Sequence, residues 1–459
     1  MRSMERTPGR ASNLAGRLGT EVCKRPDEEL RPRVYQSPDR VSFDRHRSGT
    51  SPVGPVPPAS PDPGQEAQTP IGPARGVSGE REQRVVLDVS VALRKSSELL
   101  EASRTALRVP AVGASVGPAE HRVRSVHQSV SNARPQLPSP RGPISHAVIK
   151  ALSRMTDDFN TPLVRTDDVL TDEDLQLALY CCYELHYQGF AHVSDDLEWN
   201  PSLLKLRREL EEIFEKSLRA ALIDDGGVAA AEVPDALWQM SRDNECSLSA
   251  WLQRNGTRFH AREMAMHRSG YQLKEADPHT WAIPRLNGRA KAAMVTIQSD
   301  EYGVGVAASM HSSLFADAMR ALDLDPTYGA YLDQLPAVTL ATTNLISMFG
   351  LHRRLRGALV GHLASFEMNS VGPMTRYSAW LESLGVPQYG RRFYDVHVEA
   401  DEEHQYVAVD ELVGGLLETE PDQAGAVLFG ARSVGFVERV FADHVVSAWR
   451  RDRTSLWTL

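Results

Sequence analysis

Segments with a helical spacing of apolar residues dominate the chain after residue 143, and the alternation typical of β-strands is nearly absent. The clearest segment runs over residues 201–223, where Leu203, Leu206 and Leu210 repeat every three or four positions. A run of two Asp and two Gly residues at 224–227 then ends it. This periodicity predicts an all-α architecture, in which each helix buries one apolar face against its neighbours.

The same spacing predicts further helices on both sides of this segment. One is opened by the carboxylates around Asp174 and closed by Gly189, so it carries both end signals of a helix. Others are expected at 249–275, 287–301, 310–322, 339–352, 353–367, 374–384 and 388–412. We therefore expect one helical domain over 146–459, with accessory helices in 146–248 and a core in 249–459.

The beginning of the chain has a different composition. Residues 1–143 contain 22 Lys and Arg against 15 Asp and Glu, a net charge of +7, which leaves −16 of the total of −9 for the remainder. They also hold 18 of the 28 prolines, no Trp, one Tyr and one Phe. So little apolar mass cannot offset the entropy of ordering, which predicts a disordered Pro/Arg-rich leader over 1–145. One isolated amphipathic helix, at 83–108, is the exception that the spacing favours.

The composition also bears on location and partners. A solvated leader, or a start codon assigned too far upstream, explains the basic charge better than nucleic-acid binding does. No apolar run reaches the length of a membrane span, and the sequence MRSMERTPGR lacks the hydrophobic stretch of a secretion signal. Four cysteines are too few for a disulfide framework in 459 residues. We expect a cytoplasmic protein with no nucleic-acid or membrane partner.

Three side chains that commonly bind metals lie on one face of the expected helix 388–412. His397, Asp401 and His404 fall within about 60 degrees of arc at 100 degrees per residue. Helical bundles that bind redox metals combine such carboxylates and histidines with partners from facing helices. These three residues therefore predict about half of a metal site. Without partners on other helices, such a set is more often a polar face exposed to solvent.

The remaining ligands are expected upstream. Glu275 closes one expected helix, and Glu301 lies in the next, ten residues before His311. That separation would place the two side chains about 80 degrees apart on an ideal helix. Gly303 and Gly305 lie between them and permit unwinding, so we predict that the helix is broken there.

These residues carry a family resemblance. Their order, Glu275, Glu301, His311, His397, Asp401 and His404, resembles the ligand order of the haem-oxygenase-like diiron oxidases and oxygenases. The segments HRSGYQLKEADPH, DEYGVG and HVEADEEH are also similar to bacterial proteins described as iron-containing redox enzymes. The resemblance covers about residues 150 to 455 and implies a haem-oxygenase-like helical bundle.

The resemblance further implies two Fe(II)/Fe(III) ions, with dioxygen as co-substrate. It implies a first iron on Glu301, His311 and His397, and a second on Glu275, Asp401 and His404, with one carboxylate bridging. Asp300, Asp395 and Glu367 are expected as outer partners, because ligating histidines donate their second N–H to an acceptor. Glu367 is also the first choice for an additional ligand, since it lies in an otherwise apolar stretch.

The implied activity is an oxygen-activating oxidoreductase acting on a small amino-acid-like, amine or fatty-acid substrate. N-oxygenation, desaturation, hydroxylation and carbon–carbon cleavage all stay open, and the protein would need an external reductant. A homodimer is compatible with this reading.

Alternatives belong to other classes. A haem-binding or haem-degrading protein would need one axial histidine, for which His267 is the candidate. A non-catalytic iron-binding protein would hold metal without turnover, and a hydrolase would use Cys246. Glu184 and His186 are expected to serve packing. The cluster at 352–356 is expected to be a charged helix junction, with binding of a substrate carboxylate as its less favoured role.

Overall fold

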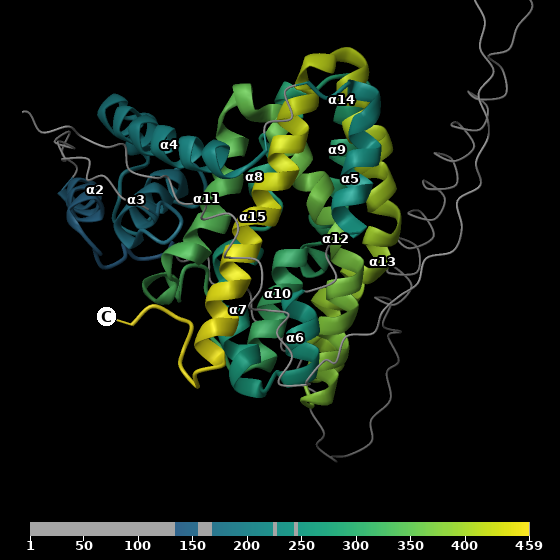
Figure 1. Cartoon of the computed structure of the whole chain (residues 1–459). Helices are drawn as coiled ribbons and strands as arrows, with labels where there is room; N and C mark the ends of the chain where they lie inside the picture. Colours follow the sequence, from purple (N-terminus) through teal and green to yellow (C-terminus); the bar gives the residue numbers. More distant parts are fainter. Residues whose placement is uncertain (1–133, 155–167, 224–226, 243–246, 459) are drawn as a thin grey trace, which may run out of the picture. The chain divides into compact units, whose positions relative to one another are not determined.

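The computed structural model describes residues 134–154, 168–223, 227–242 and 247–458. Within these residues every regular element is helical and no strand occurs, which confirms the predicted all-α class (Figure 1). Residues 1–133 of the expected leader, which include the expected helix at 83–108, lie outside the described residues. No helix in the described part is both long and apolar enough to cross a membrane.

The accessory helices precede the core. They are α2 (Pro143–Arg154), α3 (Glu173–Glu184), α4 (Pro201–Ala221) and α5 (Val233–Arg242). Capping explains two of their starts, because the side chain of Asp172 accepts from the first turn of α3 and that of Asn200 from α4. Helices α2 and α4 both pack on α3, which in turn packs on α11 (Ala337–Leu351) of the core.

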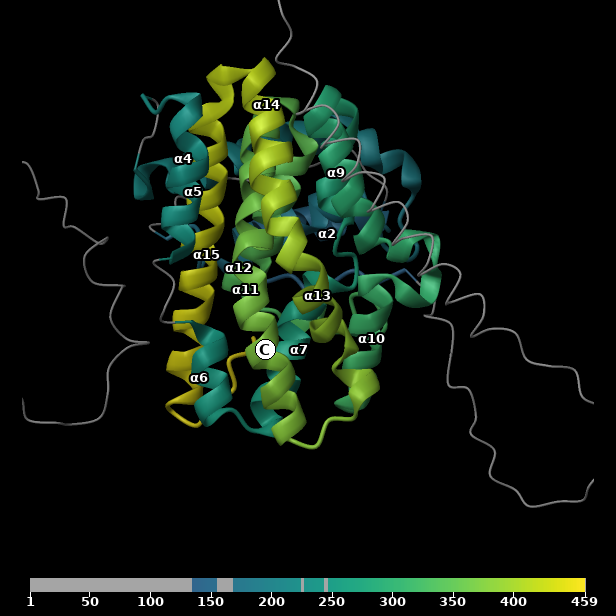
Figure 2. The ribbon, with the colours of Figure 1, turned by 90° about the vertical axis from the view of Figure 1, so that its right-hand side faces the viewer.

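The remaining α-helices form the core bundle. They are α6 (Leu248–Asn255), α7 (Arg258–Gln272), α8 (Asp277–Thr280), α9 (Gly288–Glu301), α10 (His311–Ala321), α11, α12 (Arg356–Ser383), α13 (Arg392–Tyr406), α14 (Gly414–Thr419) and α15 (Ala424–Trp449). A π-helical segment, Val407–Val413, joins α13 to α14. Figure 2 shows α12 and α13 running beside each other with α15 on the other side of α12, and both pairs are in extensive contact.

Small residues allow α12 and α15 to cross closely. A Cβ at Gly361 would overlap the carbonyl oxygen of Val427, and a Cβ at Gly430 would overlap that of Ala358. The two glycines therefore act reciprocally, each making room for the backbone of the other helix. This close crossing fixes α12, and with it the position of Glu367.

The observed helices differ from those expected in three respects. The expected helices 353–367 and 374–384 form the single helix α12, which continues through Pro373. The expected helix 249–275 is instead divided into α6 and α7 at Gly256, where the backbone is extended and a Cβ would meet Leu252 and Trp380 at 2.5 Å. The long apolar helix α15 was not among the expected segments.

The last part of the expected leader is folded. Residues 134–145 belong to the described structure, and Pro135, Pro138 and Ile144 are buried. Arg141 Nη1 lies 2.6 Å from Glu173 Oε2, which ties this stretch to the start of α3. The expectation of disorder up to residue 145 therefore does not hold for these residues, because their ion pair and apolar contacts fix them.

Candidate metal centre

The six side chains singled out from the sequence come from four parts of the bundle and are all buried. Glu275 lies in the turn after α7, Glu301 is the last residue of α9, and His311 is the first residue of α10. The other three, His397, Asp401 and His404, lie on the buried face of α13. None of the six is more than 9% exposed, so bulk water has little access to them.

The predicted break between Glu301 and His311 is confirmed. Helix α9 ends at Glu301, and the chain then turns through Gly303, Val304 and Gly305, with φ of 62°, 52° and 80°. A Cβ at Gly303 would lie 2.5 Å from the backbone nitrogen of Met310, so this turn needs a glycine. Because of the turn, both metal-binding side chains reach the same interior space.

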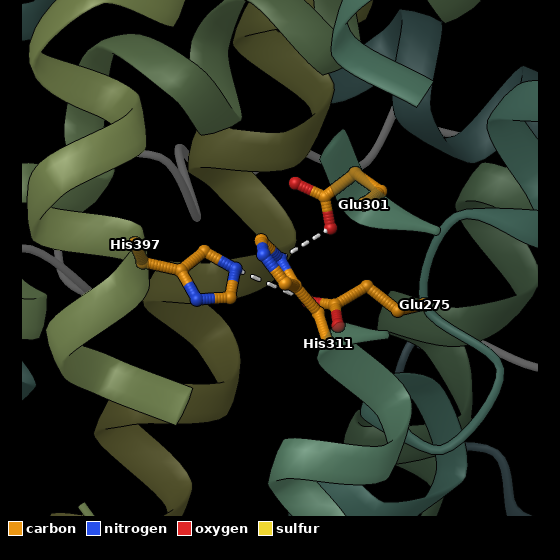
Figure 3. A group of neighbouring side chains, drawn as sticks. All are labelled: Glu275, Glu301, His311 and His397. Carbon is orange, nitrogen blue, oxygen red and sulfur yellow. Dashed lines mark ion pairs between the residues drawn. The ribbon is translucent and has the colours of Figure 1, made fainter. Parts of the chain in front are cut away.

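Four side chains form a first group (Figure 3). One ligand atom from each of Glu275, Glu301, His311 and His397 lies within 4.8 Å of the others. His311 Nδ1 is 2.8 Å from Glu301 Oε2, and His397 Nε2 is 3.4 Å from Glu275 Oε1. Figure 3 shows the imidazole of His397 reaching toward the other three side chains from the opposite helix. Two imidazoles and two carboxylates are a donor set that suits iron.

A second group shares one carboxylate with the first. Ligand atoms of Glu301, Glu367 and His404 lie within 4.8 Å of one another. His404 Nδ1 is 3.4 Å from both Glu367 Oε2 and Asp401 Oδ1, so Asp401 borders this group. Glu301 is thus common to both groups, which places its carboxylate between them.

The grouping differs in one respect from the one expected. Glu275 was assigned with Asp401 and His404, whereas the structure places it with His311 and His397. The reason is that Glu275 leaves the turn after α7 toward the first turns of α13, where His397 lies, and His404 is two turns further along. Glu367, which was expected as an additional ligand, belongs to the second group, in the place expected for Glu275.

Outer partners orient two of the imidazoles. His397 Nδ1 donates to the carbonyl oxygen of Phe393 at 2.7 Å, which leaves Nε2 to face the first group. His404 Nε2 lies 2.9 Å from Asp300 Oδ2, which leaves Nδ1 to face the second group. Asp300 therefore has the expected role of partner to a histidine. Asp395 instead accepts from Ser378, and no contact with a site histidine is seen for it among the described residues.

The charges of the site are strongly coupled. Burial opposes the imidazolium of His397, yet the hydrogen bond and charge of Glu275 outweigh it and raise the pKa to about 10. The same competition, with Asp300, Asp401 and Glu367 as partners, raises the pKa of His404 to about 12. In the metal-free protein these protons supply the positive charge that the carboxylates require.

The carboxylates respond unequally. Burial disfavours the ionised form of Glu301, but the charge of His311 outweighs this effect and lowers the pKa of Glu301 to about 2. At Glu367 burial dominates and raises the pKa to about 8, although His404 acts in the other direction. The carboxylate of Glu301, which both groups share, is therefore more firmly ionised than that of Glu367. This is expected of a group that would bridge two cations.

Unpaired atoms show that the residues fit a metal. Glu275 Oε2, Glu301 Oε2, His311 Nδ1, Asp401 Oδ1 and His404 Nδ1 are buried and make no hydrogen bond within the described chain. Leaving buried polar atoms unpaired is costly, and most such atoms in proteins have a partner. Here such atoms converge, with His311 Nδ1 2.8 Å from Glu301 Oε2 and His404 Nδ1 3.4 Å from Asp401 Oδ1 in ion-pair contacts without a hydrogen bond. A bound cation would satisfy them.

His267 is placed differently from a haem ligand. Its Nδ1 lies 2.7 Å from Thr339 Oγ1, and its Nε2 lies 2.9 Å from Ser455 Oγ, which in turn donates to Glu263. Burial lowers the pKa of His267 well below its ordinary value. With both ring nitrogens engaged, the residue has none left for an axial bond to haem iron.

The other polar clusters have structural partners. Glu184 pairs with Lys274, and His186 contacts Glu198 and Arg207. In the junction at 352–356, His352 pairs with Glu211, Arg354 with Glu215 and Arg356 with Glu420. A surface pocket of about 530 Å³ adjoins His352 and Arg354, but their charges are already matched by glutamates. Cys246, the candidate for a hydrolase, lies outside the described residues.

Comparison with known proteins agrees with this geometry. Residues 262–435 match the model of a family described as iron-containing redox enzymes, and this range holds all six residues of the two groups as well as Asp401. These residues are therefore similar to the haem-oxygenase-like iron-containing redox enzymes. The match confirms the resemblance for residues 262–435, from α7 to the first part of α15.

One curated relative has a specific activity in its name. Nitrosourea synthase from Streptomyces achromogenes subsp. streptozoticus is 23% identical over 197 residues, which is 43% of this chain and 39% of that protein. The chain thus spans well under half the length of this relative. The similarity therefore supports the family match. Nitrosourea synthesis is named for that relative only.

Proposed function

We propose that the chain binds two iron ions in the two groups and uses them to activate dioxygen for the oxidation of a small organic substrate. The observation that carries this proposal is the shared position of Glu301, which belongs to both groups. A carboxylate between two sets of imidazole and carboxylate ligands is the arrangement that dinuclear iron sites in helical bundles use.

The residues divide between the two ions as the groups do. Glu275, Glu301, His311 and His397 would hold the first ion, and Glu301, Glu367 and His404 the second, with Asp401 beside it. Bound iron would supply the electrons and the open coordination positions needed to reduce dioxygen.

The chain itself contributes rigidity, exclusion of water and proton management. The hydrogen bond from His397 to Phe393 and that between His404 and Asp300 fix which nitrogen of each ring faces the centre. Asp300 is 43% exposed, so His404 connects the buried centre to solvent through one carboxylate. This link gives a place where a proton can pass between the centre and the surface.

Several substrate classes suit an oxidant of this kind, among them amino-acid-like compounds, amines and fatty acids. The name of the similar nitrosourea synthase favours oxidation of a nitrogen atom, because a nitrosourea carries an oxidised nitrogen. An N-oxygenation of an amine or amino-acid-like compound, supported by an external reductant, is therefore our first proposal. A cytoplasmic location and a homodimer stay predictions.

The test is an anaerobic titration of metal-free protein with Fe(II). About two irons per chain are expected in the parent, with a large loss in Glu301→Ala and His397→Ala. His352→Ala is the matched control, since its imidazole pairs with Glu211. A parent that binds no iron, or variants that keep the full amount, would contradict the proposal.

Oxygen uptake separates the enzyme from a non-catalytic iron protein. The loaded ferrous protein is mixed with oxygen and a chemical reductant, and dioxygen consumption is followed with and without candidate amines. An enzyme consumes oxygen faster with substrate and accumulates oxidised amine over many turnovers, whereas in a storage protein the reductant only recycles the iron and no oxidised amine accumulates. Addition of hemin tests the haem alternative, for which the contacts of His267 predict no His267-dependent Soret band.

A further inference from the structure

A fully buried ion pair lies next to the proposed iron site. Lys274 Nζ is 3.1 Å from Glu184 Oε2, and the two side chains are 1% and 0% exposed. Transfer of two charges from water into an interior is unfavourable, and apolar replacements of similar volume often give equal or greater stability. Stability of the fold is therefore a weak explanation for this pair.

Three tyrosines and a backbone amide complete its surroundings. Tyr328 donates its hydroxyl to Glu184 Oε2 at 2.6 Å, and the backbone N–H of Gln188 donates to Glu184 Oε1 at 3.3 Å. Lys274 Nζ lies 4.1 Å from the ring centre of Tyr187 and 5.3 Å from that of Tyr180. These contacts hold the ammonium in one place from several sides.

The pair acts on the residue that follows it in the chain. The backbone N–H groups of Lys274 and Glu275 both donate to the carbonyl oxygen of Tyr271, at 2.9 and 2.8 Å, so both residues belong to one tight turn. Within this turn the side chain of Lys274 extends to α3, while that of Glu275 extends to His397. Fixing one side chain of a tight turn fixes the direction of its neighbour.

The partner of Lys274 comes from outside the family region. Glu184 is the last residue of α3, whereas the family match begins at residue 262. Besides packing on α11, helix α3 therefore reaches the residue next to Glu275 through this buried ion pair.

We propose that the Glu184–Lys274 ion pair positions Glu275 as an iron ligand, so that the accessory helix α3 is a working part of the metal centre. The proposal rests on the proposed iron-binding function. Both residues are positioning residues, because neither belongs to the two ligand groups.

The test removes both charges at once. The double variant Glu184→Leu/Lys274→Met avoids an unpaired buried charge, so the helical circular dichroism spectrum is expected to stay that of the parent. Its Fe(II) affinity at the first group is expected to fall about 10- to 100-fold, the usual effect of losing a partner outside the ligands. The absorption spectrum of the iron-loaded protein should change as well, which a merely structural role of the pair would not produce.

A second ion pair, formed by a residue of α7 shortly before this turn, provides the control. Arg268 Nη2 lies 2.6 Å from Glu438 Oε2, and Arg268→Met/Glu438→Leu removes this pair without altering a residue next to a ligand. Parental iron affinity is expected for this control. If the test variant does not fold, Glu184→Asp keeps both charges but shortens the reach, and a smaller loss of affinity is expected.

The outcomes are distinguishable. A parent that binds no iron contradicts the proposed function itself. A parent that binds iron normally, together with a folded double variant of parental affinity and spectrum, overturns the positioning role alone. For Glu184→Asp, parental affinity and spectrum overturn it likewise.

Discussion

Asp300 Oδ2 lies 2.9 Å from Nε2 of His404, so the other ring nitrogen faces the interior of the site. A carboxylate bound to the outer nitrogen of a metal-binding histidine fixes the ring orientation and raises its basicity. Asp300 is the residue before the shared carboxylate Glu301, so one short segment of α9 would support both of the proposed ions.

Replacement of Asp300 tests this support. Asp300→Ala is expected to lower the Fe(II) affinity of the second group by about 10- to 100-fold, because His404 loses its fixed orientation. Asp395→Ala is the control, since that carboxylate accepts from Ser378. Competitive titration against a chelator measures both, and equal affinities of the two variants would refute the role of Asp300.

Single-residue variants test how the two groups share Glu301. Glu301→Ala is expected to abolish binding of both ions, whereas His311→Ala should mainly remove the first and His404→Ala the second. Iron analysis after gel filtration would show about one ion per chain for each histidine variant. Retention of one tightly bound ion in Glu301→Ala would show that this carboxylate does not serve both groups.

Iron binding is expected to release protons. The pKa of His397 is raised to about 10 and that of His404 to about 12, so both imidazoles are protonated at neutral pH in the metal-free protein. Iron needs their neutral form, and its affinity should rise with pH below these values, by about tenfold per pH unit for each proton released. Calorimetry in buffers of different ionisation enthalpy counts the protons. Equal affinity at pH 6.5 and 8 would contradict this expectation.

The turn between α9 and α10 is expected to control the geometry of the first group. Gly303→Ala forces a Cβ into contact with Met310, at a φ of 62°, and should weaken iron binding at Glu301 and His311. Gly305→Ala is the matched control, because its φ is also positive but no atom lies within 4 Å of the added Cβ. If both variants lower iron affinity equally, backbone strain rather than the close approach of Gly303 is responsible.

The crossing of α12 and α15 offers a test of the fold that is independent of metal. Gly361→Ala is expected to lower the free energy of unfolding by about 1–3 kcal/mol, because its Cβ would overlap the carbonyl of Val427. Gly435→Ala in the same α15 has open space and is expected to stabilise the protein by about 0.5–1 kcal/mol. Chemical denaturation of the metal-free protein measures both changes, and a neutral Gly361→Ala would contradict the close packing.

Much of this architecture could be predicted because it depends on local sequence. The periodicity of apolar residues and the caps at Asp172 and Asn200 locate helices, since both signals act within a few residues. The break after Glu301 could also be anticipated from Gly303 and Gly305. The order of the candidate ligands follows from the resemblance.

Other features depend on packing and could not be read locally. Glu367 could be singled out by its apolar stretch, but its place in the second group follows from the position of α12 beside α13, and the pairing of Glu275 with His397 follows from the turn after α7. The expected boundary between residues 367 and 374 is absent, because contacts with α13 and α15 accompany a continuous α12 through Pro373. Helix α15 is apolar on most faces because it is buried in the bundle, which weakens the periodic signal that identifies a surface helix.

The most direct test of a dinuclear centre is ⁵⁷Fe Mössbauer and electron paramagnetic resonance spectroscopy of the same air-oxidised, iron-loaded sample. The account predicts about two irons per chain whose spins are coupled through Glu301, so the diferric protein should give no high-spin ferric resonance. A single iron per chain, or a strong resonance from isolated ferric ions, would contradict it.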